Sequence, residues 1–121
     1  MEVFLNGEWI PEEQAQVSAF DRGFLYGDGV FETIRIYQGH PFLLERHLGR
    51  LAHGLSGLHI EDPFSFDEWT DHCRELITRN KVSDGILRLY ITRGTGKRGY
   101  SSMGCSSPPC SFHHMTPPLW L

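Results

Sequence analysis

The chain has 121 residues, 40% of them hydrophobic and 21% charged, which is the balance of an ordinary globular protein with one modest core. Its formal net charge of −4 and its scattered arginines and lysines give no reason to expect a nucleic-acid partner. No apolar run approaches the length of a membrane span, and the polar N-terminus predicts a cytoplasmic protein. Three unevenly spaced cysteines do not suggest a disulfide framework.

The first third of the chain predicts a hairpin, a loop and a long strand. Asn6-Gly7 lies between two short apolar pieces, which is the commonest signal for a tight hairpin turn. Residues 20–29 contain three glycines, which predicts a loop with tight backbone geometry. The β-branched residues of 30–37 favour a strand. A turn at 38–41 and a short returning strand at 42–44 are expected next.

Two amphipathic helices and a further strand follow. Leucines recur at spacings of three and four over residues 44–58, which is one face of an α-helix. Ser65 and Glu68 form a capping-box pattern that opens a second helix, with its apolar side on residues 69–77. Residues 86–92 read as a strand, followed by a glycine-rich basic loop. Both helical stripes are expected to pack into the core.

Two motifs, GDGVFE at 27–32 with HLGR at 47–50 and TRGTGKRGYS at 92–101, resemble the class IV aminotransferases. These pyridoxal 5'-phosphate (PLP) enzymes include branched-chain and D-amino acid aminotransferases and 4-amino-4-deoxychorismate lyase. The resemblance covers about residues 1–103 and implies the small N-terminal domain. We therefore expect an α+β fold, with a small antiparallel sheet of about five strands and two helices on one side. It also implies a homodimer acting on amino acids and 2-oxo acids.

Arg50 is the main candidate for binding a cofactor. A guanidinium is planar and permanently charged, and it can hold two phosphate oxygens at once. Gly54, one turn further along the helix, leaves room for a ligand. The alternative is a solvated helix arginine paired with Glu45 or Glu61. The resemblance implies that Arg50 binds the phosphate of PLP.

Five other residues are candidates for the substrate side. The resemblance assigns Tyr26 and Phe31 to the substrate pocket, although a strand phenylalanine is ordinarily core. Arg88 has leucines on both sides, which is costly unless it meets an anion, a cavity or water. Arg98 and Tyr100 could together hold a carboxylate. The resemblance implies that their loop reaches the partner subunit, whereas the alternative is an exposed basic turn.

A catalytic lysine is not expected in this chain. PLP chemistry needs an amine that bonds the cofactor, and in the family it lies in the second domain. Lys81 and Lys97 are the only lysines, and neither matches that position. We therefore expect an N-terminal fragment of a class IV aminotransferase that is inactive alone. The alternatives are 4-amino-4-deoxychorismate lyase and a non-catalytic remnant.

The tail at 105–121 differs from the expected domain at 1–104. It has four prolines in two pairs, no valine or isoleucine, and no formally charged residue. This change predicts a shifted or truncated reading frame and a disordered or loosely packed tail. Cys105, Cys110, His113 and His114 are zinc-capable. Adjacent histidines suit a tetrahedral site poorly, however, so no metal is expected.

Overall fold

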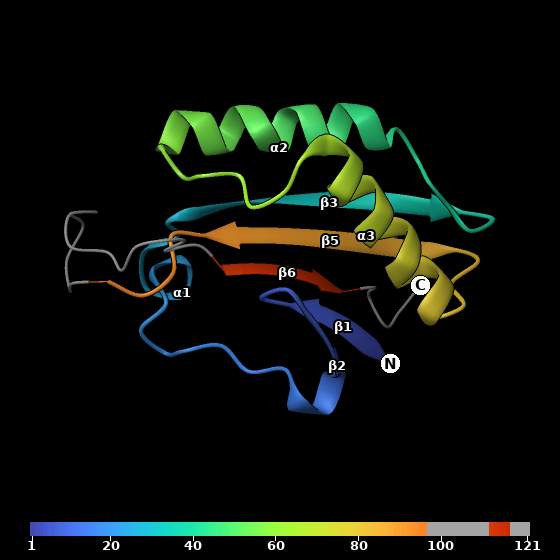
Figure 1. The fold of residues 1–121 in the computed structure, drawn as a ribbon, viewed down its shortest axis with the longest axis horizontal. Helices are drawn as coiled ribbons and strands as arrows, with labels where there is room; N and C mark the ends of the chain where they lie inside the picture. The colour runs from blue at the N-terminus through green and yellow to red at the C-terminus, as the bar shows by residue number, and fades with distance from the viewer. Residues whose placement is uncertain (97–111, 117–121) are drawn as a thin grey trace.

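An antiparallel sheet with two helices against one face forms the fold (Figure 1). The computed structural model describes residues 1–96 and 112–116, with side chains described for residues 1–96. The described part contains six strands in the order β2-β1-β6-β5-β3-β4. The expected α+β class is confirmed, with one strand more than expected. No helix in the described part is long and apolar enough to span a bilayer.

The N-terminal hairpin forms where Asn6-Gly7 predicts it. β1 (Glu2–Leu5) pairs with β2 (Glu8–Pro11), and the two turn residues have φ angles of 51° and 85°. Positive φ at both central residues matches the twist of a two-residue hairpin, and asparagine and glycine tolerate it best. The hairpin lies at one edge of the sheet.

The long central pair of strands has two different faces. β3 (Gly29–Tyr37) pairs with β5 (Gly85–Thr92) from Gly29 opposite Thr92 to Ile36 opposite Gly85. Alternation places one set of side chains toward the helices and the other on the open face. The helix-facing set includes buried Ile34 and Leu89.

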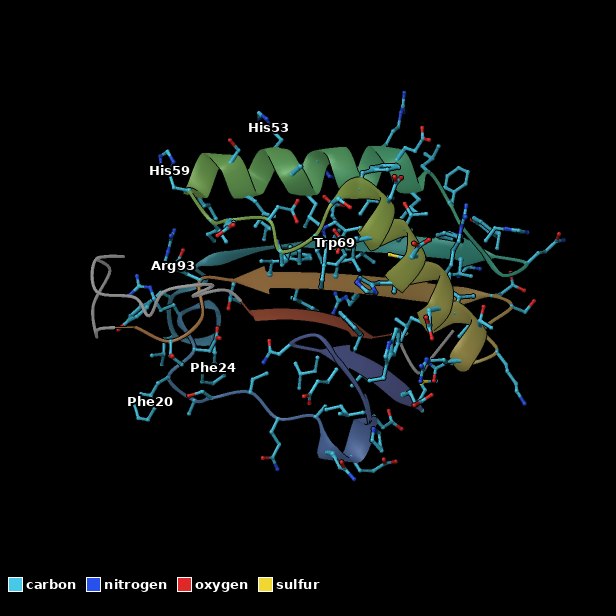
Figure 2. All side chains as sticks on the ribbon, viewed as in Figure 1. Phe20, Phe24, His53, His59, Trp69 and Arg93 are labelled. Carbon is cyan, nitrogen blue, oxygen red and sulfur yellow. The ribbon has the colours of Figure 1, made fainter. Side chains whose placement is uncertain are left out.

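The two helices cover the first face of the sheet. α2 (Leu44–Leu58) buries its leucine stripe, and α3 (Phe66–Arg79) buries Trp69, which is 2% exposed and points toward the sheet (Figure 2). The capping box is present: Ser65 Oγ accepts from the Glu68 amide at 3.2 Å, and Glu68 Oε1 accepts from the Ser65 amide. Burial of each large apolar side chain stabilises the fold by about 1.5–3 kcal/mol.

Two local details differ from the sequence expectation. The returning strand is β4 (His40–Pro41) rather than residues 42–44, because Leu43 is left-handed at φ 54° and α2 begins at Leu44. The glycine-spaced loop contains a short helix, α1 (Arg22–Tyr26). Asp21 begins it by accepting a hydrogen bond from the Gly23 amide, and Gly27 ends it in the left-handed conformation. A 3₁₀ turn, η1 (Glu12–Gln14), follows the hairpin.

The tail contributes a strand at residues 112–116, which differs from the expectation of a disordered or loosely packed tail. β6 (Phe112–Thr116) lies between β1 and β5 and pairs with both. The proline pairs flank these five residues and do not interrupt them. Every amide of the strand is therefore free to donate. The domain boundary near residue 104 remains a prediction.

Candidate functional site

Arg50 is held by a buried carboxylate on the neighbouring strand. Its Nε donates to Glu32 Oε1 at 2.6 Å, and its Nη2 donates to Glu32 Oε2 at 2.7 Å. His47 Nδ1 lies 2.8 Å from the same Oε2. The side chain of Glu32 is 4% exposed, whereas that of Arg50 is 71% exposed. Arg50 pairs with Glu32 rather than with Glu45 or Glu61, the partners considered from sequence.

The charges of Glu32 and Arg50 stabilise each other. Burial raises the pKa of Glu32, but hydrogen bonds from Arg50 and His47 outweigh burial and hold that pKa below its ordinary value. Glu32 in turn raises the pKa of Arg50. An ionised carboxylate only accepts hydrogen bonds, so Nδ1 of His47 carries the proton between them.

A hollow opens beside the Arg50 guanidinium. It has a volume of about 480 Å³ and lies between β3 and α2, with Gly29, Thr33, Arg50 and Gly54 among its lining. A Cβ added at Gly54 would lie 3.0 Å from Cγ1 of Val30. Glycine therefore lets the helix approach the strand closely here.

A second hollow lies on the open face of the sheet. It has a volume of about 600 Å³, and its lining includes Phe31, Arg88 and Tyr90. Phe31 is 60% exposed, so it is not the core residue that its strand position allows. Its ring stacks on Tyr90 at 5.8 Å between centroids, and Arg88 Nη1 donates to the Tyr90 hydroxyl at 2.9 Å. Arg88 thus faces a hollow, which is one of the three surroundings that its sequence suggested.

Asp28 fixes the loop between the two hollows. Its Oδ2 accepts from Nε of Arg22 and from Nε of Arg93, each at 2.8 Å. Burial raises the pKa of Asp28, and hydrogen bonds from Arg93 and Arg22 lower it below its ordinary value. Arg93 also donates from Nη2 to the Leu58 carbonyl at 2.6 Å, at the end of α2 (Figure 2). One carboxylate therefore ties the glycine loop to the helix that carries Arg50.

The remaining candidates are only partly brought together. Tyr26 lies in α1 with the Arg22 guanidinium 5.0 Å from its ring, and it lines neither hollow. Arg98 and Tyr100 lie outside the described residues. Lys81 ends the α3 region in a left-handed turn and lines neither hollow.

Zinc ligation by the tail also falls outside the described side chains, and the described residues contain no metal-suited cluster of three His, Cys, Asp or Glu. Cys73 is fully buried in the core, and burial raises the pKa of its thiol to about 12. A thiol in that state is a packing group rather than a nucleophile or a metal ligand.

The sequence contained a signal for the residues that were missed. Glu32 shares the inward phase of β3 with Ile34 and Ile36, so a buried charge in need of partners was predictable. His47 precedes Arg50 by three positions and therefore lies on the same side of α2.

Comparisons with known proteins agree with this fold and these motifs. The family model described as amino-transferase class IV matches residues 29–118. A putative branched-chain-amino-acid aminotransferase of Methanocaldococcus jannaschii is 42% identical over 89% of this chain and 38% of its own length. The aminodeoxychorismate lyase of Bacillus subtilis is 38% identical over 95% of this chain and 41% of its own.

Solved structures give the same result. The branched-chain amino acid aminotransferase from Escherichia coli superposes with a TM-score of 0.86 at 25% identity, covering 98% of this chain and 41% of the other. The chain belongs to the class IV aminotransferase family, whose members depend on PLP. It spans about two fifths of the length of these relatives.

Proposed function

We propose that this chain is the phosphate-binding and substrate-facing part of a PLP-dependent amino-acid aminotransferase that works as a homodimer in the cytoplasm. The reaction would move an amino group between an amino acid and a 2-oxo acid. One observation carries the proposal: Arg50 presents an exposed guanidinium at a hollow, with two of its nitrogens fixed by Glu32. Within the described residues, Nη1 makes no hydrogen bond and remains able to meet a ligand.

The residues at this hollow fit the phosphate end of PLP. A phosphate monoester carries close to two negative charges at neutral pH, and arginine binds its oxygens with paired donors. Gly54 lines the hollow beside Arg50 without adding a side chain that would fill it. When bound, PLP supplies an electron sink for chemistry at the amino-bearing carbon. The described residues offer no amine at either hollow, so we assign no catalytic residue within them.

We assign the open-face hollow to the substrate. Arg88 supplies a cation for a carboxylate, and Phe31 supplies an apolar surface for a side chain. We add Tyr26, Arg98 and Tyr100 to the substrate side as candidates from the family motifs.

In a protein that carries these residues together with the rest of the family's length, Arg98→Ala should raise KM for the carboxylate substrate and leave cofactor binding largely intact.

The test of the phosphate site compares two ligands that differ only in the phosphate. Pyridoxamine 5'-phosphate should bind the 121-residue chain more tightly than pyridoxamine, as measured by calorimetry. Arg50→Met should remove most of that difference, because it deletes a charge-assisted contact of about 1.5–3 kcal/mol. Arg46→Met is the matched control, since Arg46 is an exposed arginine on the same helix. Equal loss in both variants would exclude a specific phosphate site at Arg50.

The alternative activity is that of 4-amino-4-deoxychorismate lyase, which uses the same cofactor to release pyruvate. The Bacillus subtilis lyase matches 95% of this chain, which keeps this reading open. The two activities differ in product. A protein with the full family length would either release pyruvate from aminodeoxychorismate or exchange amino groups with 2-oxo acids. If neither product forms, the result favours the non-catalytic remnant.

A further inference from the structure

Glu32 is a buried carboxylate whose side-chain hydrogen bonds, among the described residues, are all with two residues of α2. It is 4% exposed, and a buried carboxylate without partners is strongly disfavoured. Both of its oxygens accept from Arg50, and Oε2 is also 2.8 Å from His47 Nδ1. The carboxylate therefore has a fixed position, with a cation on its solvent side and an imidazole beside that cation.

This arrangement constrains Arg50 more than its exposure would suggest. An arginine that is 71% exposed on a helix ordinarily samples many rotamers. Here Nε and Nη2 are both engaged by one carboxylate, which fixes the plane of the guanidinium. Nη1 then points away from that pair of bonds. A donor held in place before the ligand arrives loses less entropy on binding.

We propose that Glu32 is a positioning residue: its carboxylate lines the same hollow but, being an anion, binds no phosphate, and it orients Arg50 for a phosphate-type anion. The inference rests on the proposed phosphate site at Arg50. His47 Nδ1 lies at the same carboxylate oxygen that accepts from Arg50 Nη2, and the three residues form one unit, here called the Glu32 clamp (Glu32, His47 and Arg50).

The clamp and a simple charge argument predict opposite effects for one substitution. Glu32→Gln removes a negative charge beside Arg50, so the electric field alone would strengthen anion binding. The same change places an amide donor against the guanidinium donors and destroys the paired hydrogen bonds while keeping the volume. Positioning therefore predicts weaker binding, and charge predicts tighter binding.

The experiment uses the 121-residue chain, inorganic phosphate and nitrogen-15 NMR of the arginine Nε–H groups. In the unsubstituted protein, Arg50 Nε–H should exchange with water more slowly than that of Arg46, which is exposed on the same helix. Phosphate should shift the Arg50 signal. In Glu32→Gln the slow exchange should be lost, and the phosphate Kd should rise about threefold to tenfold.

Three further variants make the outcomes distinct. Glu45→Gln, which removes an exposed carboxylate from the same helix, should change neither exchange nor Kd. If Arg50→Met leaves the phosphate Kd unchanged, the proposed phosphate site itself is wrong. If Arg50→Met weakens phosphate but Glu32→Gln binds it as well or better, the site stands and the positioning role is overturned.

The wild-type spectrum tests the inference even where Glu32→Gln does not fold. Exchange of Arg50 Nε–H as fast as that of Arg46 would overturn the clamp without any variant. Glu32→Asp provides the conservative comparison, because it keeps the charge but withdraws the carboxylate by one methylene. The phosphate Kd of Glu32→Asp should lie between those of the wild type and Glu32→Gln. A Kd equal to that of Glu32→Gln would show that the position of the carboxylate, and not its charge, sets the affinity, which also supports positioning.

Discussion

Glu32 occupies a position of β3 that its neighbours fill with isoleucine. Ile34 and Ile36 are fully buried on the same face, and Glu32 is 4% exposed. Replacing such a carboxylate with a packed apolar group is often neutral for stability. Because burying the Glu32 carboxylate costs free energy, its presence here suggests a role other than stabilising the fold. At the scale of single residues, the group around Arg50 is a part of this chain where charge rather than packing decides the local structure, as is the group around Asp28.

The Glu32 carboxylate should make part of the protein's stability depend on pH. Its pKa is held below the ordinary value of 4.5, so it stabilises the fold above that value, and the contribution is lost as pH falls through the lowered pKa. Unfolding by urea should therefore show a larger loss of stability between about pH 6 and pH 3 in the wild type than in Glu32→Gln. Parallel acid dependence in the two proteins would mean that Glu32 gains no net stabilisation from Arg50 and His47.

At the scale of elements, a close approach of the backbone explains one glycine near the site, Gly29, and does not explain another, Gly57. A Cβ at Gly29 would lie 2.5 Å from the Ile91 carbonyl oxygen, a backbone atom of the paired strand. A Cβ at Gly57, on α2, would meet nothing within 4 Å. The same substitution should therefore have opposite effects at the two positions.

Gly29→Ala should destabilise the protein by about 1–3 kcal/mol, because the added methyl group forces β3 and β5 apart. Gly57→Ala should stabilise it by about 0.5–1 kcal/mol through helix propensity. Both values come from the free energy of unfolding in urea. A stabilised Gly29→Ala protein would contradict the close strand approach at that residue.

Elements with a clear period were predictable from the sequence, and those set by partners were not. The leucine spacing predicted α2, and Ser65 with Glu68 predicted the start of α3. Arg50 was found through its motif, and its exposure agrees with its place outside the leucine stripe. Its partner Glu32 is 18 positions away, a separation at which local patterns carry no information. β6 was missed because its strand is specified by the open edges of β1 and β5 rather than by its own composition.

On the scale of the whole molecule, apolar side chains gather at the end of the sheet that carries α1. Phe24 is 73% exposed and Phe20 is 57% exposed, and both point outward there (Figure 2). Val17 and Phe31 are also more than half exposed, and both line the open-face hollow, as Phe24 does. Clustered exposure of this kind favours association.

The 121-residue chain should therefore self-associate with rising concentration in sedimentation experiments. The double variant Phe20→Ser/Phe24→Ser should reduce that association, because it removes two of the exposed aromatic rings of this cluster. Phe66→Ser on α3 is the control, since Phe66 is also exposed but lies on another element. A sharp monomer at all concentrations would count against a surface that needs covering.

Incubation with PLP and borohydride should not label one lysine of this chain selectively. Lys81 lines neither hollow, and a lysine that bonds PLP has to be held close to the cofactor and partly desolvated. Mass spectrometry should find weak labelling spread over accessible amines, and no turnover of amino acids. Stoichiometric labelling of Lys81 or Lys97 with measurable turnover would contradict the assignment of no catalytic residue.

The position of β6 predicts how the N-terminal hairpin is attached to the rest of the sheet. In the described part of the sheet, β6 joins β1 to β5, since Leu5 pairs with His114 and His114 pairs with Tyr90. A proline at position 114 removes an amide donor from a strand that is paired on both sides. His114→Pro should therefore destabilise the protein by about 3 kcal/mol and speed hydrogen exchange at residues 3–5. His114→Ala keeps the amide and should leave that exchange nearly unchanged. If the proline variant also left residues 3–5 protected, β6 would not be the strand that joins the hairpin to the sheet.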